Sequence, residues 1–84
     1  MILSWAEDAC DDYIYWQKHD KTILAKINKI IKDIKRSPYS GVGSPEPLKH
    51  KWSGYWSRRI TKEHRIVYKI IRNEVIIARC RYHY

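Results

Sequence analysis

The spacing of apolar residues divides the chain into a helical first part and a β-rich second part. Over residues 6–19 and 20–35 apolar side chains recur every three or four positions, which is the period of an amphipathic helix. After residue 47 the period falls to two, as in strands with one buried face. Residues 37–47 hold all three prolines and two of the three glycines, so we expect a connector without regular structure there.

Each expected helix has a recognisable start. Ser4 and Glu7 have the spacing of a capping box, and Asp20 is a residue type that caps helices well. The first helix has an apolar stripe, and Asp12 is assigned with the other acidic residues to its solvent side. The stripe consists of Ala6, Ala9, Cys10, Tyr13, Ile14 and Trp16. The isoleucines of the second helix are interpreted as core packing.

Four segments are predicted to be strands. The short apolar run "MILSW" precedes the first helix, and alternating segments cover residues 53–60, 64–71 and 74–82. Short loops separate the last three, which makes them antiparallel neighbours. The sequence therefore predicts a single α+β domain over residues 1–84, in which two amino-terminal helices pack on one face of a small, mainly antiparallel twisted sheet.

The alternation also assigns the two faces of this sheet. Even-numbered residues of the last two strands are mostly apolar and are expected to face the helices. They are Ile66, Tyr68, Ile70, Ile76, Ala78, Cys80 and Tyr82. The odd-numbered face is basic: Arg65, Lys69, Arg79, Arg81 and His83. A three-residue loop would place Arg59 opposite Arg65 on that face, and because two arginines repel, we expect an anion between them.

The charge of the chain points to an anionic partner. The formal net charge is +8, and residues 35–84 carry twelve Lys or Arg against three Glu. The chain also has four Trp and seven Tyr but no Phe, and such rings suit stacking on nucleic-acid bases. No helix is basic enough for a DNA recognition helix, and the "GVG" segment lacks the lysine and helix of a phosphate-binding loop.

The sequence gives no sign of a membrane, a cofactor or a metal. The amino terminus lacks the features of a signal peptide, and no apolar run approaches the roughly 20 residues that cross a bilayer. Cys10 and Cys80 lack a C-x-x-C spacing and are expected to stay reduced in the cytoplasm, with a disulfide between them as the less favoured alternative. Cys80 and His83 have a spacing that could bind zinc, but the alternation turns them to opposite faces.

Three kinds of side chain in the basic half could cleave RNA without a metal. Glu46 lies between two prolines that restrict its backbone, so its carboxylate is well held and could be a general base. Arg59 and Arg65 could stabilise charge at phosphorus, and His83 could protonate the leaving oxygen. Glu46 could equally neutralise a nearby lysine. From the residues alone, a nuclease and a non-catalytic RNA-binding module are equally well supported.

Several segments resemble the YoeB/Txe branch of the RelE toxin superfamily. They are "DDYIYWQ", "SPEPLKH", "SGYWSRRIT", "EHRIVY" and the terminal "CRYHY", and the likeness extends over essentially the whole chain. Glu46 together with His83 favours this branch, because other RelE relatives generally lack the pair. The resemblance implies a RelE-like microbial ribonuclease fold.

The resemblance also implies a function. It implies a toxin that enters the ribosomal A site, cleaves the messenger RNA there and is neutralised by a YefM-like antitoxin. Glu46 would be the general base, Arg65 the transition-state stabiliser and His83 the general acid. Further residues would bind or orient the RNA: Lys49, Arg59, Tyr84 and, on the basic face, Arg81. Homodimer formation and codon preference stay open at this point.

Overall fold

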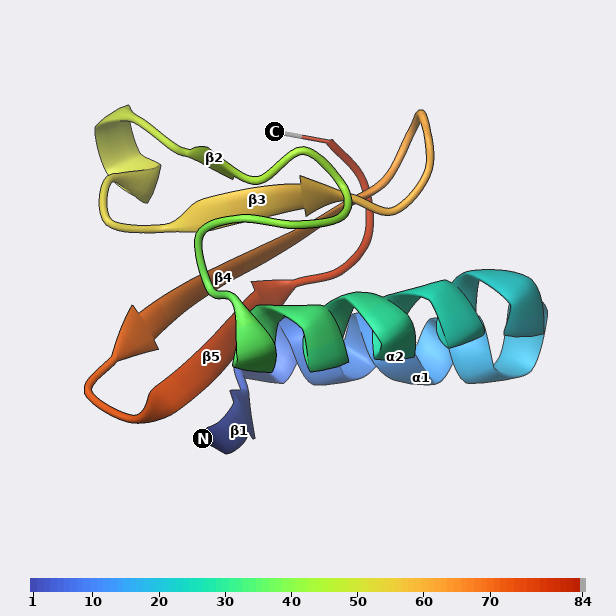
Figure 1. The fold of residues 1–84 in the computed structure, drawn as a ribbon. Helices are drawn as coiled ribbons and strands as arrows, with labels where there is room; N and C mark the ends of the chain where they lie inside the picture. The colour runs from blue at the N-terminus through green and yellow to red at the C-terminus, as the bar shows by residue number, and fades with distance from the viewer. Residues whose placement is uncertain (84) are drawn as a thin grey trace.

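The computed structural model describes residues 1–83, which form two α-helices, a short 3-10 helix and a five-stranded sheet (Figure 1). The elements follow in the order β1 (Ile2–Trp5), α1 (Glu7–His19), α2 (Lys21–Arg36), β2 (Glu46–Pro47), η1 (His50–Trp52), β3 (Trp56–Arg59), β4 (Arg65–Ile71) and β5 (Glu74–Arg79).

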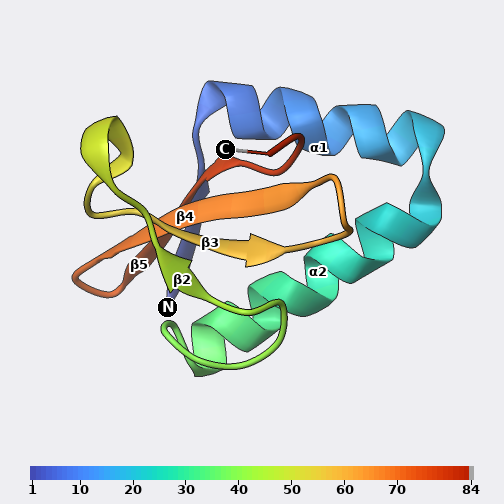
Figure 2. The same cartoon turned by 90° about the horizontal axis from the view of Figure 1, so that it is seen from above.

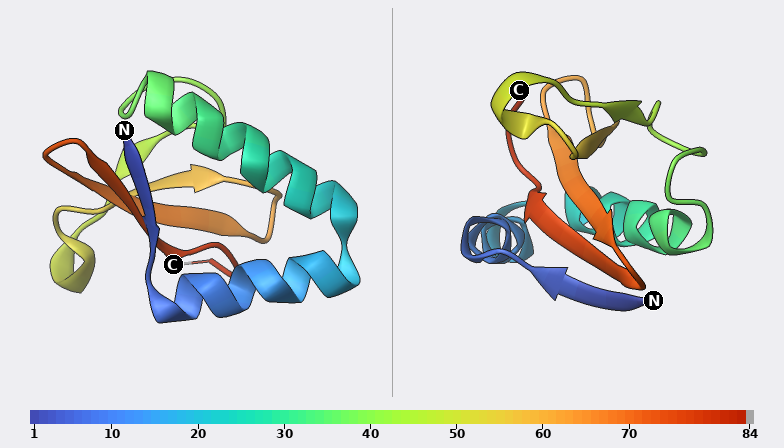
Figure 3. Two further views of the ribbon diagram at one scale, coloured as in Figure 1. Left: turned by 90° about the horizontal axis from the view of Figure 1, so that it is seen from below. Right: turned by 90° about the vertical axis from the view of Figure 1, so that its left-hand side faces the viewer.

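The sheet has the strand order β1-β5-β4-β3-β2. Strand β1 is parallel to β5, and the other three pairings are antiparallel. The two helices lie on one face of this twisted sheet, while β2 and η1 lie at its far edge (Figures 2 and 3). The predicted α+β class, with both amino-terminal helices on one face, is confirmed.

One of the two predicted helix caps is present in the structure and the other is not. Asp20 caps α2 as predicted, because its Oδ1 accepts hydrogen bonds from the N–H groups of Thr22 (3.0 Å) and Ile23 (3.1 Å). The capping box at the start of α1 is wrong, since Ala6 is the N-cap and provides no side-chain bond. The hydroxyl of Ser4 instead donates to the carboxylate of Glu74 in the neighbouring strand.

The core lies between the helices and the middle of the sheet. Burial of these apolar side chains is the main favourable contribution to folding. Its fully or almost fully buried members are Ala9, Trp16, Ile27, Ile30, Ile31, Ile34, Ile60, Ile66, Tyr68, Val75, Ile77 and Cys80. The assignment of the isoleucines of α2 and the even-numbered face of β4 to the core is therefore confirmed. Cys10 and Ile14, which were placed on the inner stripe of α1, are exposed.

The face assignment of the last strand is wrong for Ile76 and Ala78 but correct for Cys80, which is fully buried in the core. The turn between β4 and β5 is formed by Arg72 and Asn73, and Ile70 pairs with Val75. Because paired residues of antiparallel strands point to the same face, the even-numbered face of β4 continues as the odd-numbered face of β5. Val75 and Ile77 are accordingly fully buried in the core. The half-buried residues of the opposite face are Ile76 and Ala78.

The last strand is also shorter than predicted. Tyr68 pairs with Ile77 but Val67 pairs with Arg79, so Ala78 is an extra residue in a β-bulge. Strand β5 ends at Arg79, one residue after the bulge. The chain then turns, and Tyr82 is 53% exposed with a positive φ of 68°. The expectation that Tyr82 lies in the core is therefore wrong.

A fully buried arginine joins the sheet to the end of α2. The Nη1 of Arg58 donates to Oδ2 of Asp33 (2.6 Å), and its Nε donates to the hydroxyl of Tyr68 (3.1 Å). The other guanidinium bonds go to connector carbonyls: Ser37, Ser40 (2.9 Å) and Val42 (3.3 Å). A buried charge requires this degree of compensation, because leaving it unpaired would be very costly.

Asp33 and Tyr68 complete this buried group. The backbone N–H of Val42 donates to Oδ2 of Asp33 (3.0 Å), and this bond, followed by that from Arg58, holds the pKa of Asp33 below its usual value. The Tyr68 hydroxyl donates to the carbonyl of Pro38 (2.7 Å), and burial raises its pKa. At Gly41, with φ of 120°, a Cβ would lie 2.1 Å from Oδ2 of Asp33. The connector therefore packs closely around the ion pair.

Within the described part of the chain, no helix has the length and apolar content needed to cross a bilayer.

We predict that Arg58→Ala lowers the free energy of unfolding by about 3 to 5 kcal/mol, because it leaves the Asp33 carboxylate buried without its main cation. Urea denaturation measures this loss. The matched control is Arg36→Ala, which removes a second ion pair of the same carboxylate from an arginine whose side chain is 79% exposed. It should cost less than about 1 kcal/mol. Equal losses in the two variants would contradict the role given to Arg58.

The two cysteines should differ in reactivity. Both are free; Cys10 is exposed, whereas Cys80 is buried. Burial, and then the negative charge of Asp12, raises the pKa of the Cys80 thiol to about 12. We predict that iodoacetamide at pH 8 alkylates Cys10 in the folded protein and leaves Cys80 unmodified, because the thiolate is the reacting form. Mass spectrometry locates the label. Both thiols should react in urea, and similar native rates at the two positions would refute the prediction.

Candidate active site

A small hollow at the far edge of the sheet collects the predicted base and both predicted arginines. It has a volume of about 50 Å³ and is lined by Gly43, Ser44, Glu46, Ser57, Arg59 and Arg65. Glu46 lies in β2 and pairs with Ser57 of β3, so the two residues share this face. The connector was expected to lack regular structure, but this short strand fixes the backbone of Glu46 against the sheet.

The two arginines lie directly opposite each other, as the sequence predicted. Arg59 of β3 pairs with Arg65 of β4, and both line the hollow. The guanidinium of Arg65 is held from behind, because its Nη1 donates to three loop carbonyls. These are Thr61 (2.9 Å), His64 (3.1 Å) and Lys62 (3.3 Å). The hollow therefore has one anchored and one exposed cation beside an exposed carboxylate.

A glycine brings the connector onto the strand that carries Arg59. The backbone N–H of Arg59 donates to the carbonyl of Gly43 (2.6 Å). Gly43 has a φ of 82°, and a Cβ there would lie 2.8 Å from the carbonyl oxygen of Arg59. A larger residue would push the connector away from β3, and Glu46, three residues further on, would move with it.

The chain end is held at its beginning by α1. The backbone N–H of Cys80 donates to Oδ2 of Asp12 (3.0 Å), and the indole of Trp16 donates to the Cys80 carbonyl (2.9 Å). Asp12 is only 5% exposed, so its assignment to the solvent side of the helix is wrong. These two side chains replace the strand partner that Cys80 would otherwise need.

Two residues later the chain end meets the start of β4. The backbone N–H of Arg65 donates to the carbonyl of Tyr82 (2.8 Å), and the N–H of Tyr82 donates to Nδ1 of His64 (2.8 Å). His83 is the next residue and is exposed. The predicted general acid is therefore the sequence neighbour of Tyr82, whose carbonyl is bonded to the backbone N–H of Arg65. In Figure 1 the segment after β5 passes the loop between β3 and β4 in agreement with these bonds.

Two arginines that were assigned to the basic face contact α1. Arg79 forms a two-point ion pair with Asp12, with Nε to Oδ2 at 2.9 Å and Nη2 to Oδ1 at 3.2 Å. The guanidinium carbon of Arg81 lies 3.5 Å from the centre of the Tyr15 ring. The pairing of Val67 with Arg79 keeps Arg79 on the predicted face of the sheet, because the bulge at Ala78 restores the alternation that the turn before β5 reversed. Both guanidinium groups nevertheless contact α1, and neither lines the hollow.

None of the remaining predicted residues that the structure describes lines the hollow. Lys49 is exposed and immediately precedes η1. Tyr84 lies outside the described residues. Lys69 stays on the sheet as predicted, with its Nζ 4.8 Å from the centre of the Tyr55 ring.

Four residues that organise the site were missed by the sequence interpretation: Asp12, Asp33, Arg58 and His64. Asp33 had a detectable signal, since it is the one acidic residue in the sequence of α2 and lies within the isoleucine stripe. Arg58 has the strand parity of the core residue Ile66, with which it pairs. The sequence gives no comparable signal for His64, whose partner is a backbone group 18 residues away.

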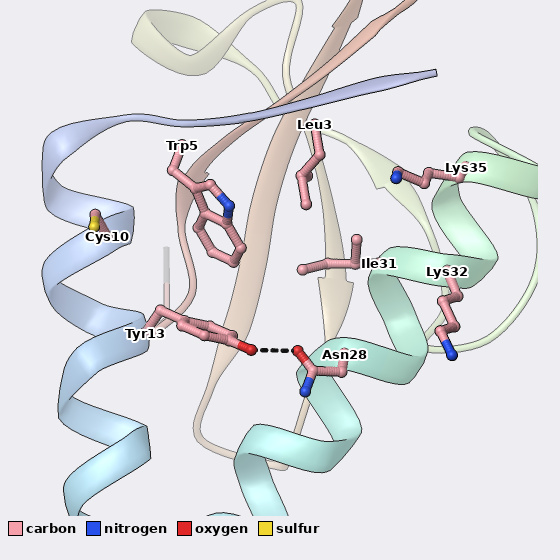
Figure 4. Close-up of a pocket in the computed structure, with 8 residues that line it drawn as sticks. All are labelled: Leu3, Trp5, Cys10, Tyr13, Asn28, Ile31, Lys32 and Lys35. Carbon is pink, nitrogen blue, oxygen red and sulfur yellow. Dashed lines mark hydrogen bonds between the residues drawn. The ribbon is translucent and has the colours of Figure 1, made fainter.

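A much larger hollow lies elsewhere, between β1, α1 and α2 (Figure 4). Its volume is about 560 Å³, and its lining includes Leu3, Trp5 and Ile31, with a hydrogen bond from the Tyr13 hydroxyl to Asn28 at its mouth (2.6 Å). Its lining contains no carboxylate, histidine or arginine, whereas the small hollow combines a carboxylate with two arginines. Among residues 1–83, no three His, Cys, Asp or Glu side chains gather as a metal site would require. Size therefore does not identify the site; chemistry favours the small hollow.

Comparison with known proteins shows which family this chain resembles. Residues 5–84 match the model of the family described as YoeB-like toxin of bacterial type II toxin-antitoxin system. A protein named Toxin YoeB from Escherichia coli O6:H1 is 60% identical over the full length of both chains. A YoeB/ParE toxin from Agrobacterium tumefaciens, 46% identical, has a TM-score of 0.97 over all of both chains.

Two structures from Staphylococcus aureus are also similar to this chain. One is of a YoeB dimer (44% identity, TM-score 0.93), and the other is of a heterotetrameric YoeB-YefM toxin-antitoxin complex (44%, 0.92). In each, the match covers all of this chain and 98% of the other.

Proposed function

Because this chain belongs to the family of YoeB-like toxins of bacterial type II toxin-antitoxin systems, we propose that it is an endoribonuclease that cleaves messenger RNA in the ribosomal A site and thereby stops translation. The observation that carries the proposal is the hollow in which Glu46 shares one face of the sheet with Arg59 and Arg65, beside a chain end that carries His83.

The proposed reaction uses the ribose as nucleophile. Glu46 takes the proton from the 2'-hydroxyl, and the 2'-oxygen attacks the adjacent phosphorus. The bond from phosphorus to the 5'-oxygen then breaks, and His83 gives that oxygen a proton. The products are a 2',3'-cyclic phosphate and a 5'-hydroxyl. The atoms and the protons balance without a metal, since the base and the acid each transfer one proton.

The arginines suit the charge that develops in this reaction. As phosphorus becomes five-coordinate, negative charge gathers on its non-bridging oxygens, and fixed cations stabilise it most. Arg65 is held by three carbonyls and does not have to reorganise. Arg59 lies opposite and repels it in the free protein, so a phosphate between them relieves that repulsion.

The size of the hollow supports a substrate that another body holds in place. About 50 Å³ accommodates a phosphate group but not a whole nucleotide. Alignment of the 2'-hydroxyl for in-line attack must then come from outside the hollow, and the ribosome provides it in our proposal. Lys49 and Tyr84 would contact the RNA around the hollow. We assign Arg81 to holding the chain end, because its guanidinium is stacked on Tyr15.

We further propose that the chain is inhibited by a YefM-like antitoxin and that it forms homodimers. The Staphylococcus aureus relative is a YoeB dimer in one of the structures named above and part of a heterotetrameric YoeB-YefM complex in the other. An acidic antitoxin segment that folds on binding would neutralise Arg59 and Arg65 and cover the hollow. Inhibition would then follow from occlusion of the site.

We predict that His83→Gln retains the fold and ribosome binding but that its cleavage rate falls by about 100-fold or more, which is the usual scale for a positioned acid. Single-turnover cleavage on programmed ribosomes, in buffer with excess chelator, measures the rate, and end analysis identifies the products. The matched control is His19→Gln at the exposed end of α1, which should cleave at the wild-type rate. Deleting Tyr84 should cost less than His83→Gln if Tyr84 orients the RNA.

Two outcomes would contradict this proposal. Wild-type cleavage by His83→Gln would remove the histidine from the reaction, and 5'-phosphate products that depend on a divalent metal would replace the mechanism. Salt-sensitive ribosome binding without cleavage by the wild type would favour the non-catalytic RNA-binding module.

For the antitoxin, we predict that its binding slows hydrogen exchange of the strands that carry Arg59 and Arg65, and that its affinity falls steeply with salt. Arg59→Glu should weaken binding of the cognate antitoxin at least tenfold, whereas Lys18→Glu, at an exposed position in the last turn of α1 that does not line the hollow, should leave it unchanged. An inhibitory complex in which only the helices are protected would refute occlusion.

A further inference from the structure

The four described residues after β5, residues 80–83, have little regular structure, yet their backbone is held by hydrogen bonds at Cys80 and Tyr82. Cys80 is bonded through both its N–H and its carbonyl to α1, and Tyr82 is bonded through both its N–H and its carbonyl to the start of β4. The side chain of Tyr82 is 53% exposed, and its ring lies 6.0 Å from that of His64 and 4.6 Å from the guanidinium carbon of Arg81. The chain end is therefore fixed through its backbone.

The conformation of Tyr82 shows that these contacts determine its position. Its φ of 68° lies in the left-handed region, which is unfavourable for a residue with a Cβ. This conformation turns the N–H toward His64 and the carbonyl toward the N–H of Arg65, each at 2.8 Å. Strained backbone of this kind persists only where its surroundings over-determine it, and such positions cluster at functional sites.

His64 is itself rigid. Its ring meets the buried Trp16 ring edge to face, with centroids 4.8 Å apart and an interplanar angle of 78°. Trp16 in turn donates to the carbonyl of Cys80. The carbonyl of His64 accepts from Arg65 Nη1 and also from the N–H groups of Ile60 and Thr61. One residue thus touches both the cation of the hollow and the chain end.

We propose that His64 is a positioning residue, whose Nδ1 holds the backbone N–H of Tyr82 and thereby places His83 beside Arg65. This inference rests on the proposed role of His83 in cleavage. Because Nδ1 accepts a hydrogen bond, the imidazole is neutral and carries its proton on Nε2. His64 touches neither the reacting phosphate nor the leaving oxygen, and it acts only through the chain end.

A purely structural role of His64 and a positioning role predict that different substitutions of His64 are tolerated. If His64 only packs against Trp16, Phe should replace it well, because it retains an aromatic ring. If the acceptor matters, Asn should replace it, because its Oδ1 occupies the position of Nδ1. Gln is the matched comparison for Asn, since its amide group reaches the position of Nε2 instead.

The first test observes the bond and needs no ribosome. In uniformly 15N-labelled wild-type protein, a scalar coupling through the hydrogen bond should join the Tyr82 amide nitrogen to Nδ1 of His64. Hydrogen exchange of the Tyr82 amide should be roughly fivefold to tenfold faster in His64→Phe than in the wild type, as expected for one lost hydrogen bond. In His64→Asn it should stay close to the wild-type rate. Absence of the coupling in the folded wild type would overturn the inference.

The second test measures single-turnover cleavage at saturating ribosome concentration. We expect His64→Phe and His64→Gln to cleave about 10- to 100-fold more slowly with unchanged ribosome affinity, because a small displacement of the acid lowers the chemical step. His64→Asn should cleave within threefold of the wild type. His19→Phe, the same change at an exposed position on α1, should match the wild type.

The outcomes separate this inference from the proposed function. Wild-type cleavage by His64→Phe, or equal losses in the Asn and Phe variants, would overturn the positioning role even if both proteins fold. If His64→Phe does not fold, the Asn and Gln pair decides the same question. If the wild type has the coupling but cleaves no RNA, the proposed function fails while the anchoring of the chain end stands.

Discussion

The buried guanidinium of Arg58 is the constraint on which the position of the connector depends. It joins β3 to the carboxylate of Asp33 at the end of α2 and to carbonyls along the connector. Without regular structure of its own, this segment would have many conformations of similar free energy. The buried charge of Arg58 requires hydrogen-bond acceptors, and only a conformation that supplies the connector carbonyls to it is stable. Glu46 reaches the hollow because the preceding residues are bound in this way.

The candidate site is assembled from three parts that are fixed independently. The Arg58 network places Glu46, strand pairing places Arg59 beside Arg65, and the anchors on α1 and β4 place His83. The hollow has little apolar lining to hold a ligand, so its geometry must come from hydrogen bonds behind it. The side chains that provide those bonds are mostly buried, while those that face the ligand are exposed. This division lets a domain with a small core keep two opposed cations at its surface.

Much of the fold follows from the sequence, but the end of the chain does not. Apolar periodicity predicts the helices and strands, and loop length predicts that Arg59 and Arg65 are opposite. Parity fails in β5 because a two-residue turn reverses it and a bulge at Ala78 interrupts it. Neither effect can be derived from residue types alone. The roles of Asp12 and His64 are also hidden, because each binds a backbone group far away in the sequence.

The neighbouring residues Arg58 and Arg59 show how the register of β3 is protected. Alternation along a strand turns one of them inward and the other outward, and their identical side chains would let a one-residue slip replace one with the other. A slip that moves Arg58 to the position of Arg59 would move Ser57 to the position of Arg58, leaving Asp33 with a serine in place of its buried cation. A slip in the other direction would place Arg59 beside Asp33, but it would move the core residue Ile60 to the exposed position of Arg59. A buried ion pair adds little net stability compared with apolar packing, but it makes the wrong register costly. The same arginine that holds the connector therefore also determines which arginine lines the hollow.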